Sequence, residues 1–218
     1  MCGIFASADT IKLENLFNLN YKRGQKGFSQ NGFSFFDGNS LVWESRNESK
    51  RLEIDPKFLS DYNICHVVAP TTSTPRFHPA IRDARDHENE GFTALWHNGI
   101  LKQGTIDELR KTEDESTWDT QLIVDRLHYL DGNEETGDFL SSLDGSFACL
   151  LLKDSQLFVF RNALSPMYFD NTLNFSSVKF SFSNLLTAGA VFHVDFENRQ
   201  LVDTGIHFTT KNDPYNLG

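Results

Sequence analysis

The spacing of apolar residues predicts strands near both ends of the chain and helices between them. The opening segment 2–7 is short and apolar, as buried strands are, and residues 31–45 place FSFF and LVWES on either side of the turn pair Asp37-Gly38. A further strand, 92–96, runs into a turn. Toward the C-terminus, apolar segments predict strands at 147–152, 157–160 and 175–182, and a hairpin over 191–202.

Three segments have apolar residues at helical spacing or begin with a capping pattern. Asp9 or Thr10 is placed to cap the first helix. The apolar stripe of this helix comprises Ile11, Leu13, Leu16 and Phe17. Residues 105–108 form a capping-box pattern, and 116–130 form a longer helical segment. Because strands, helices and strands follow in turn without strict βαβ alternation, we expect an α+β fold of packed layers with mostly antiparallel sheets.

The composition fits one folded domain over residues 1–218. Hydrophobic residues make up 39% of the chain and 20 residues are Phe, which is enough to fill a large core. The formal net charge of −10 repels phosphate groups, so we expect no nucleic-acid partner. No apolar run approaches the ~18 residues of a membrane helix, and the N-terminus lacks a signal-peptide pattern, so we expect no membrane partner.

The three cysteines, Cys2, Cys65 and Cys149, are too few and too irregularly spaced for a disulfide framework or a metal site. We therefore expect free thiols in a reducing cytoplasm, and no metal site at the cysteines. Cys65 is followed by His66, but neighbours on a strand point to opposite faces, so this pair is not expected to form a catalytic dyad. Cys149 lies in an apolar strand, where we expect it to be buried.

Cys2 is the candidate nucleophile. The small residue at position 2 permits removal of Met1 by methionine aminopeptidase, which would leave Cys2 with a free α-amino group. The pKa of such an amine is about 8, so part of it is neutral at physiological pH and takes the thiol proton directly or through one water. Gly3 lets the backbone approach the thiol. Taken alone, however, a cysteine at position 2 is more often accidental.

Further motifs follow Cys2, and their order resembles that of class II glutamine amidotransferases. They are MCGIF at the start, Arg23-Gly24-Gln25, HVVAPT from His66, His97-Asn98-Gly99, LDGSFA from Leu143, and Phe160-Arg161-Asn162. Each motif is weak alone, but the ordered set spans about residues 2 to 170. The resemblance implies the four-layer αββα sandwich of N-terminal nucleophile hydrolases, with two mostly antiparallel sheets.

The resemblance also implies roles for individual residues. Asn98 would donate its side-chain amide, and Gly99 its backbone N–H, to an oxyanion hole that stabilises the charge formed when an amide carbonyl is attacked. Asn-Gly is also a common turn pair. Arg23 would hold the loop beside the nucleophile or help to bind substrate, or else end the first helix, where a cation is favoured. Asp119 would bind the α-amino group of glutamine, form part of a helix cap with Ser116, or do both.

Position 68 departs from the family pattern. Where the family has His-x-Arg, whose arginine pairs with the α-carboxylate of glutamine, this chain has His66-Val67-Val68. Valine cannot make a bidentate pair with a carboxylate. Three explanations stay open: Arg76 supplies the charge from a neighbouring loop, the substrate is another primary or γ-glutamyl amide without a free α-carboxylate, or glutamine binding has decayed. We favour relocated or altered recognition, because the nucleophile and oxyanion motifs remain.

The implied function is an amidohydrolase that releases ammonia from glutamine, or from a related small amide, through a thioester on Cys2. In the family, ammonia passes to a synthetase or transferase domain. Because the sequence ends at Gly218, we expect a separate synthetase or transferase chain to receive it. Two alternatives stay open: an N-terminal-cysteine hydrolase of a different amide, and a degenerate, non-catalytic binding subunit. Retention of Met1 would favour the degenerate subunit, because the amine would be blocked.

Overall fold

Two antiparallel sheets organise the computed structural model, which describes residues 2–24, 30–36, 41–47, 62–68, 78–83, 91–111 and 118–209. The first, seven-stranded sheet has the order β11 (Asn184–Leu185), β9 (Tyr168–Phe169), β10 (Phe175–Ser176), β1 (Gly3–Ser7), β4 (Tyr62–Val68), β2 (Gln30–Phe36) and β3 (Leu41–Asn47). The second, six-stranded sheet has the order β13 (Gln200–His207), β12 (Ala190–Asp195), β8 (Gln156–Arg161), β7 (Gly145–Lys153), β6 (Phe92–Leu101) and β5 (Ala80–Asp83).

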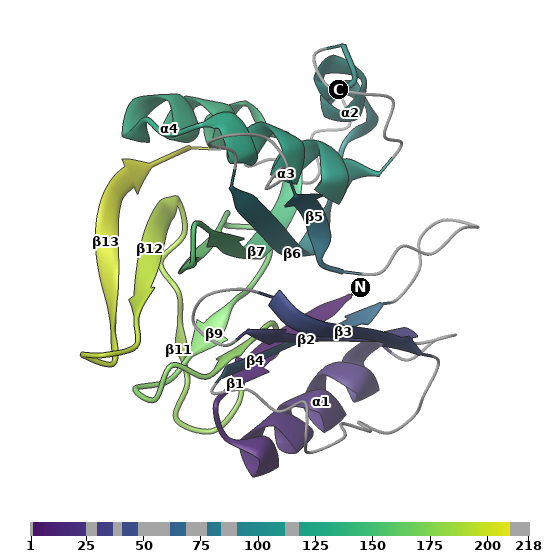
Figure 1. The fold of residues 1–218 in the computed structure, drawn as a ribbon, viewed down its shortest axis with the longest axis vertical. Coiled ribbons are helices and arrows are strands. Elements are labelled where there is room, and N and C mark those ends of the chain that lie inside the picture. The colour runs from purple at the N-terminus through teal and green to yellow at the C-terminus, as the bar shows by residue number, and fades with distance from the viewer. Residues whose placement is uncertain are drawn as a thin grey trace.

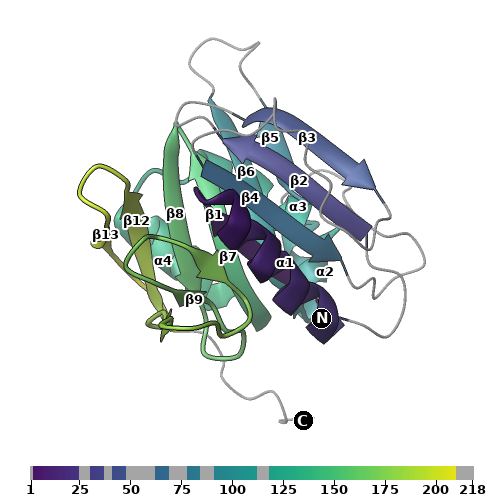
Figure 2. The ribbon, with the colours of Figure 1, turned by 90° about the horizontal axis from the view of Figure 1, so that it is seen from below.

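Helices cover the outer face of each sheet, so the molecule has four layers (Figure 1). Helix α1 (Thr10–Gly24) lies across the first sheet, as the view from below shows (Figure 2). The other face of the molecule carries α2 (Gln103–Leu109), α3 (Asp119–Tyr129) and α4 (Asn133–Ser142) over the second sheet. This arrangement confirms the α+β fold and the αββα order of layers that the sequence resemblance implied.

Alternation along the strands divides the buried side chains among three cores. On β1, Ile4 and Ala6 face the second sheet and pack in the core between the sheets, whereas Phe5 faces α1. On β6, Trp96 belongs to the core between the sheets, and Leu95 lies under the helices. Even-numbered residues of β1 and even-numbered residues of β6 therefore face each other across the middle of the molecule.

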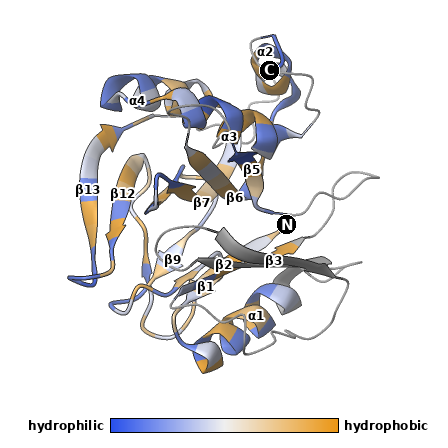
Figure 3. Cartoon of the chain, viewed as in Figure 1, coloured by the Kyte–Doolittle hydropathy of each residue, from blue (hydrophilic) through white to orange (hydrophobic). Residues whose placement is uncertain are grey.

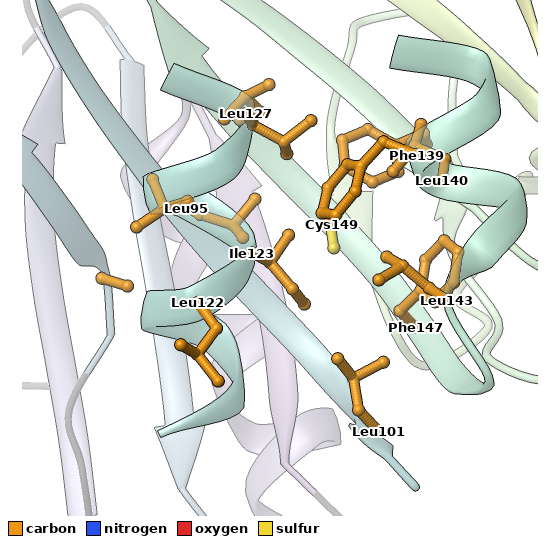
Figure 4. Close-up of a cluster of buried hydrophobic side chains, with 14 of the residues drawn as sticks. Leu95, Leu101, Leu122, Ile123, Leu127, Phe139, Leu140, Leu143, Phe147 and Cys149 are labelled. Atoms are coloured by element: carbon orange, nitrogen blue, oxygen red, sulfur yellow. The ribbon is translucent and has the colours of Figure 1, made fainter. Parts of the chain in front are cut away.

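The core under the helices is built mainly from leucines and aromatic residues. Leu122, Ile123 and Leu127 of α3 meet the second sheet beside Cys149 of β7 (Figure 4). Fully burying one such aliphatic side chain stabilises a fold by about 1.5–3 kcal/mol. Figure 3 shows hydrophilic residues gathered on α3 and α4, whose outer faces meet solvent. Burial of these apolar side chains of α3 fixes the helix, and hence Asp119 at its start, against the second sheet.

The first helix begins as expected but does not bury its whole predicted stripe. The Asp9 carboxylate accepts the backbone N–H of Lys12 at 2.9 Å, which confirms the predicted cap. Leu13, Leu16 and Phe17 are buried, but Ile11 is 74% exposed, so its place in the stripe was wrong. Ile11 precedes Leu13 by two residues, which is a rotation of about 200° around a helix.

Two other local predictions were also wrong. Helix α2 begins at Gln103 without a side-chain cap, and the Thr105 hydroxyl instead accepts the backbone N–H of Asp144 at 3.2 Å. The strand expected over 175–182 is limited to β10, and Phe182 is 98% exposed. The two predicted hairpins are present as the pairs β2–β3 and β12–β13, although the turn at 37–38 lies outside the described residues.

All three cysteines carry free thiols. Cys65 and Cys149 are buried, as expected, and burial raises the pKa of both thiols well above the ordinary value. No helix in the described part of the chain is long and apolar enough to cross a membrane.

Candidate functional site

Cys2 comes directly before β1, near the middle of the first sheet. Strand β1 lies between β10 and β4; Gly3 at its start pairs with Val67 of β4, and β10 pairs further along the strand, at Phe5 and Ala6. Continuing the alternation of Ile4 and Ala6 assigns Cys2 to the side of the strand that faces the second sheet. Its residue is half-buried, unlike Cys65 and Cys149. Of the three thiols, therefore, that of Cys2 combines partial access with a position between the sheets.

Gly3 follows the candidate nucleophile because α1 leaves no room for a side chain there. A Cβ at Gly3 would lie 2.6 Å from the Asn20 Oδ1 atom. The Asn20 amide is itself held, since it donates to the Leu16 carbonyl at 2.8 Å and to the Ser176 hydroxyl at 2.9 Å. The Asn20 side chain thus links α1 to β10 and leaves Gly3, at the start of β1, no room for a side chain.

Asn98 and Gly99 lie within β6 rather than in a free turn. Both are paired with β7, Asn98 opposite Ala148 and Gly99 opposite Phe147. Asn98 is 5% exposed, and by alternation it shares the Trp96 face of β6, which looks toward β1. The Asn98 amide and the candidate nucleophile are therefore assigned to facing sides of the two sheets.

At Gly99 the two strands approach too closely for any other residue. A Cβ there would lie 2.6 Å from His97 Nε2 and still closer to the carbonyl oxygen of Ser146 on β7. The backbone of Gly99 is therefore fixed by contacts from its own strand and from the next one. Fixed backbone donors of this kind are what an oxyanion site requires.

Asp119, expected to bind substrate or to cap a helix, is the first residue of α3. One carboxylate oxygen accepts the backbone N–H of Leu101 at 3.3 Å, and the other accepts that of Thr120 at 2.8 Å. The residue before the helix, Trp118, provides no side-chain cap, and Ser116 lies outside the described residues. Asp119 thus joins the end of β6 to the start of α3.

The remaining candidates are only partly described. Arg23 lies in the last turn of α1, and its side chain is outside the described part of the structure, as is the whole of Arg76. Val68 is the last residue of β4, one position beyond the pair that Val67 forms with Gly3. Position 68, where the family has arginine, is therefore close in register to the candidate nucleophile.

Three histidines whose contact the sequence did not predict lie together near this region. His66 of β4 and His78 stack with ring centroids 3.8 Å apart, and His97 of β6 is 6.4 Å from His78. All three are at most 5% exposed. Burial lowers the pKa of His66 to about 3 and also lowers that of His97, so both rings are neutral at physiological pH. Their separation along the chain gave no signal of this contact.

Arg161 and Asn162 have a structural part. The buried Arg161 guanidinium donates to the carbonyls of Leu186 and Ser165 at 2.6 and 3.2 Å. The Asn162 side chain accepts the Phe147 N–H at 3.2 Å and donates to the Gly145 carbonyl at 2.7 Å. These bonds close the turn after β8 and hold the start of β7, which is the strand paired with Asn98 and Gly99.

Comparison with known proteins finds similarity at the level of structure. The sequence matches no protein-family model and no curated protein. A solved structure of glutamine phosphoribosylpyrophosphate amidotransferase from B. subtilis matches 93% of this chain with a TM-score of 0.65 and 18% identity. A structure described as the allosteric regulatory enzyme of purine biosynthesis matches 93% with a TM-score of 0.69 and 17% identity.

This chain spans about half the length of those two structures, since the match covers 48% of each. At such low identity the similarity concerns the fold. The chain has the fold of a class II glutamine amidotransferase domain.

Proposed function

We propose that this protein is an amidohydrolase that releases ammonia from glutamine through a thioester on Cys2. The observation that carries the proposal is the arrangement of β1 and β6 on the two facing sheets. It assigns Cys2 and Asn98 to surfaces that look at each other. The similarity in fold to glutamine amidotransferases supports the same chemistry.

The reaction proceeds in two halves. With Met1 removed, the free amine of Cys2 takes the thiol proton, and the thiolate attacks the side-chain amide carbon of glutamine. The tetrahedral intermediate collapses as its C–N bond breaks, and the amine returns the proton to the departing ammonia. Water then attacks the thioester carbon, which yields glutamate and regenerates the thiol. No metal or organic cofactor enters any step.

Asn98 and Gly99 stabilise the oxyanion of each tetrahedral intermediate. The Asn98 side chain donates from the face of β6 that looks toward β1, and Gly99 donates its backbone N–H. Removing one such donor from a site of this kind typically lowers kcat by about 10²–10³. The tight packing of Gly99 against Ser146 and His97 supports this role, because a donor that is already fixed needs no reorganisation during the reaction.

The released ammonia passes to a synthetase or transferase that resides in a partner chain. The B. subtilis protein is, by its name, an amidotransferase that acts with phosphoribosylpyrophosphate, which supports transfer of the released ammonia. We propose the cytoplasm as the site of action, with neither nucleic acid nor membrane as partner. Arg23 and Arg76 are the proposed contacts for the charged groups of the substrate.

A second candidate is hydrolysis of a different amide by the same nucleophile. One observation favours it: Val68 occupies the position at which the family binds the α-carboxylate. A substrate without a free α-carboxylate would need no arginine at that position.

Ammonia release separates these possibilities. We would compare glutamine with asparagine, glutaminamide and γ-glutamyl amides, and include Cys2→Ala and, as the matched control, Cys65→Ala, which removes a buried thiol. The proposal requires release from glutamine by the wild type and by Cys65→Ala but not by Cys2→Ala. Release from another amide alone would support the second candidate. If none of these amides released ammonia, the protein would be a non-catalytic binding subunit.

A further inference from the structure

A continuous series of contacts joins the first sheet to the strand that carries Asn98 and Gly99. His66 of β4 stacks on His78, which comes just before β5. His78 Nε2 lies 3.2 Å from the Thr120 hydroxyl oxygen in the first turn of α3. The same oxygen lies 3.1 Å from His97 Nδ1, and His97 Nε2 lies 3.4 Å from the carbonyl oxygen of Ser146.

The partners of this series determine where its protons lie. A carbonyl oxygen only accepts, so His97 Nε2 must carry a proton to bond Ser146. Because burial keeps His97 neutral, its Nδ1 is then unprotonated and accepts the single hydroxyl proton of Thr120. The Thr120 oxygen in turn accepts from His78 Nε2. The chain of donors thus runs from His78 through Thr120 and His97 to Ser146.

The Ser146 end of this hydrogen-bond series lies against the proposed oxyanion hole. The Ser146 carbonyl is the group against which Gly99 packs, and His97 Nε2 would meet a Cβ at Gly99 within 2.6 Å. His97 also precedes Asn98 directly. A rotation of the His97 ring would therefore disturb the two residues that follow it. Within the described residues, no group of three histidine, cysteine or acidic side chains could hold a metal ion.

We propose that Thr120 is a positioning residue that fixes the orientation and tautomer of His97 and thereby holds Asn98 and Gly99 in place. This inference rests on the proposed function. Thr120 is 1% exposed and acts through His97 rather than on substrate. A competing acceptor is the Asp119 carboxylate, 3.4 Å from the Thr120 hydroxyl. If the hydroxyl turned to Asp119, a neutral His97 would have to donate from Nδ1 and would lose its bond to Ser146.

The test uses Thr120→Val, which keeps the shape and removes the hydroxyl, and Thr120→Ser, which keeps the hydroxyl. We expect Thr120→Val to lower kcat for ammonia release from glutamine by about tenfold, with KM changed by less than about twofold, since the interaction matters chiefly in the transition state. Thr120→Ser should restore most of kcat. Independently, ¹⁵N NMR of the wild-type imidazoles should find His97 protonated on Nε2 and unprotonated on Nδ1.

Two results would overturn the inference. One is a folded Thr120→Val variant with wild-type kcat, which would reduce Thr120 to a packing role even if its melting temperature fell. The other is a wild-type His97 protonated on Nδ1, a result that stands even if Thr120→Val does not fold. A wild type that releases no ammonia, but has the expected His97 tautomer, would instead overturn the proposed function and leave the hydrogen-bond chain in place.

Discussion

Replacing Gly99 by alanine would force β6 and β7 apart at the proposed oxyanion hole. The new Cβ would lie 2.6 Å from His97 Nε2 and closer still to the Ser146 carbonyl oxygen, well inside the ~3.5 Å at which atoms pack. A backbone carbonyl in a sheet cannot rotate away. Overpacking of this kind costs about 1–3 kcal/mol, and a lost ladder hydrogen bond adds about 1 kcal/mol. A loss near 3 kcal/mol lowers Tm by roughly 6–12 °C in a chain of this size.

Gly104→Ala is the matched control for this substitution. Gly104 lies in α2, and a Cβ there would meet nothing within 4 Å. The control should be neutral or stabilising by up to about 1 kcal/mol. Thermal unfolding followed by circular dichroism gives Tm for both variants. Ammonia release is then measured at a temperature at which Gly99→Ala is folded. The kcat of Gly99→Ala is expected to fall by about 10²-fold, because the backbone donor moves. If Gly99→Ala had the same Tm as Gly104→Ala and kept full activity, β6 and β7 would tolerate a side chain at position 99, contrary to this expectation.

Three further results are expected. In the native protein a thiol reagent should modify Cys2 while Cys65 and Cys149 react only after unfolding, because both are buried and burial raises the pKa of their thiols; native modification of Cys65 would contradict this. Val68→Arg should raise kcat/KM for glutamine by about tenfold if only the carboxylate clamp is missing, and no gain in the ammonia assay would rule that explanation out. Between pH 6.5 and about 3 the unfolded state binds a proton that buried His66 does not, so His66 should lower the free energy of unfolding by about 1.4 kcal/mol for each unit that the pH falls. In urea titrations His66→Leu should remove this contribution and leave a shallower dependence, because burial also lowers the pKa of His97.

The layers of the fold could be predicted because the alternation of strand side chains between two faces is visible in the sequence. Ile4 and Ala6 alternate with Phe5, and each set occupies a different core. The same period assigned Cys65 and His66 to opposite faces, and Cys65 indeed packs toward α1. Such patterns depend only on the local strand and on which face is buried.

After β10, local hydrogen bonds prevent the strand that the apolar pattern predicts. After β10 the chain continues to alternate phenylalanine with polar residues, yet the Ser183 hydroxyl accepts the Phe180 N–H at 3.1 Å and closes a turn. Phe182 adopts a φ of 62° in that turn and points into solvent. Serine side chains can hydrogen-bond the backbone in place of a strand ladder. The spacing of apolar residues does not reveal this competition.

The histidine cluster could not be predicted for a different reason. His66, His78 and His97 come from the first sheet, a connecting segment and the second sheet, and α3 supplies Thr120 between two of them. Their contact arises only when the two sheets and the helix have packed. The departure at Val68, by contrast, was visible in the sequence, because it lies inside a recognisable motif.

The proposed role of Cys2 is tested most directly by intact mass and peptide mapping after reaction with 6-diazo-5-oxo-norleucine, a glutamine-like alkylating agent. We expect a chain without Met1 that gains one reagent molecule less N₂, with the adduct on the thiol of the N-terminal Cys2. A chain that retains Met1 and remains unmodified, or one whose adduct lies on Cys65 or Cys149, would contradict this role.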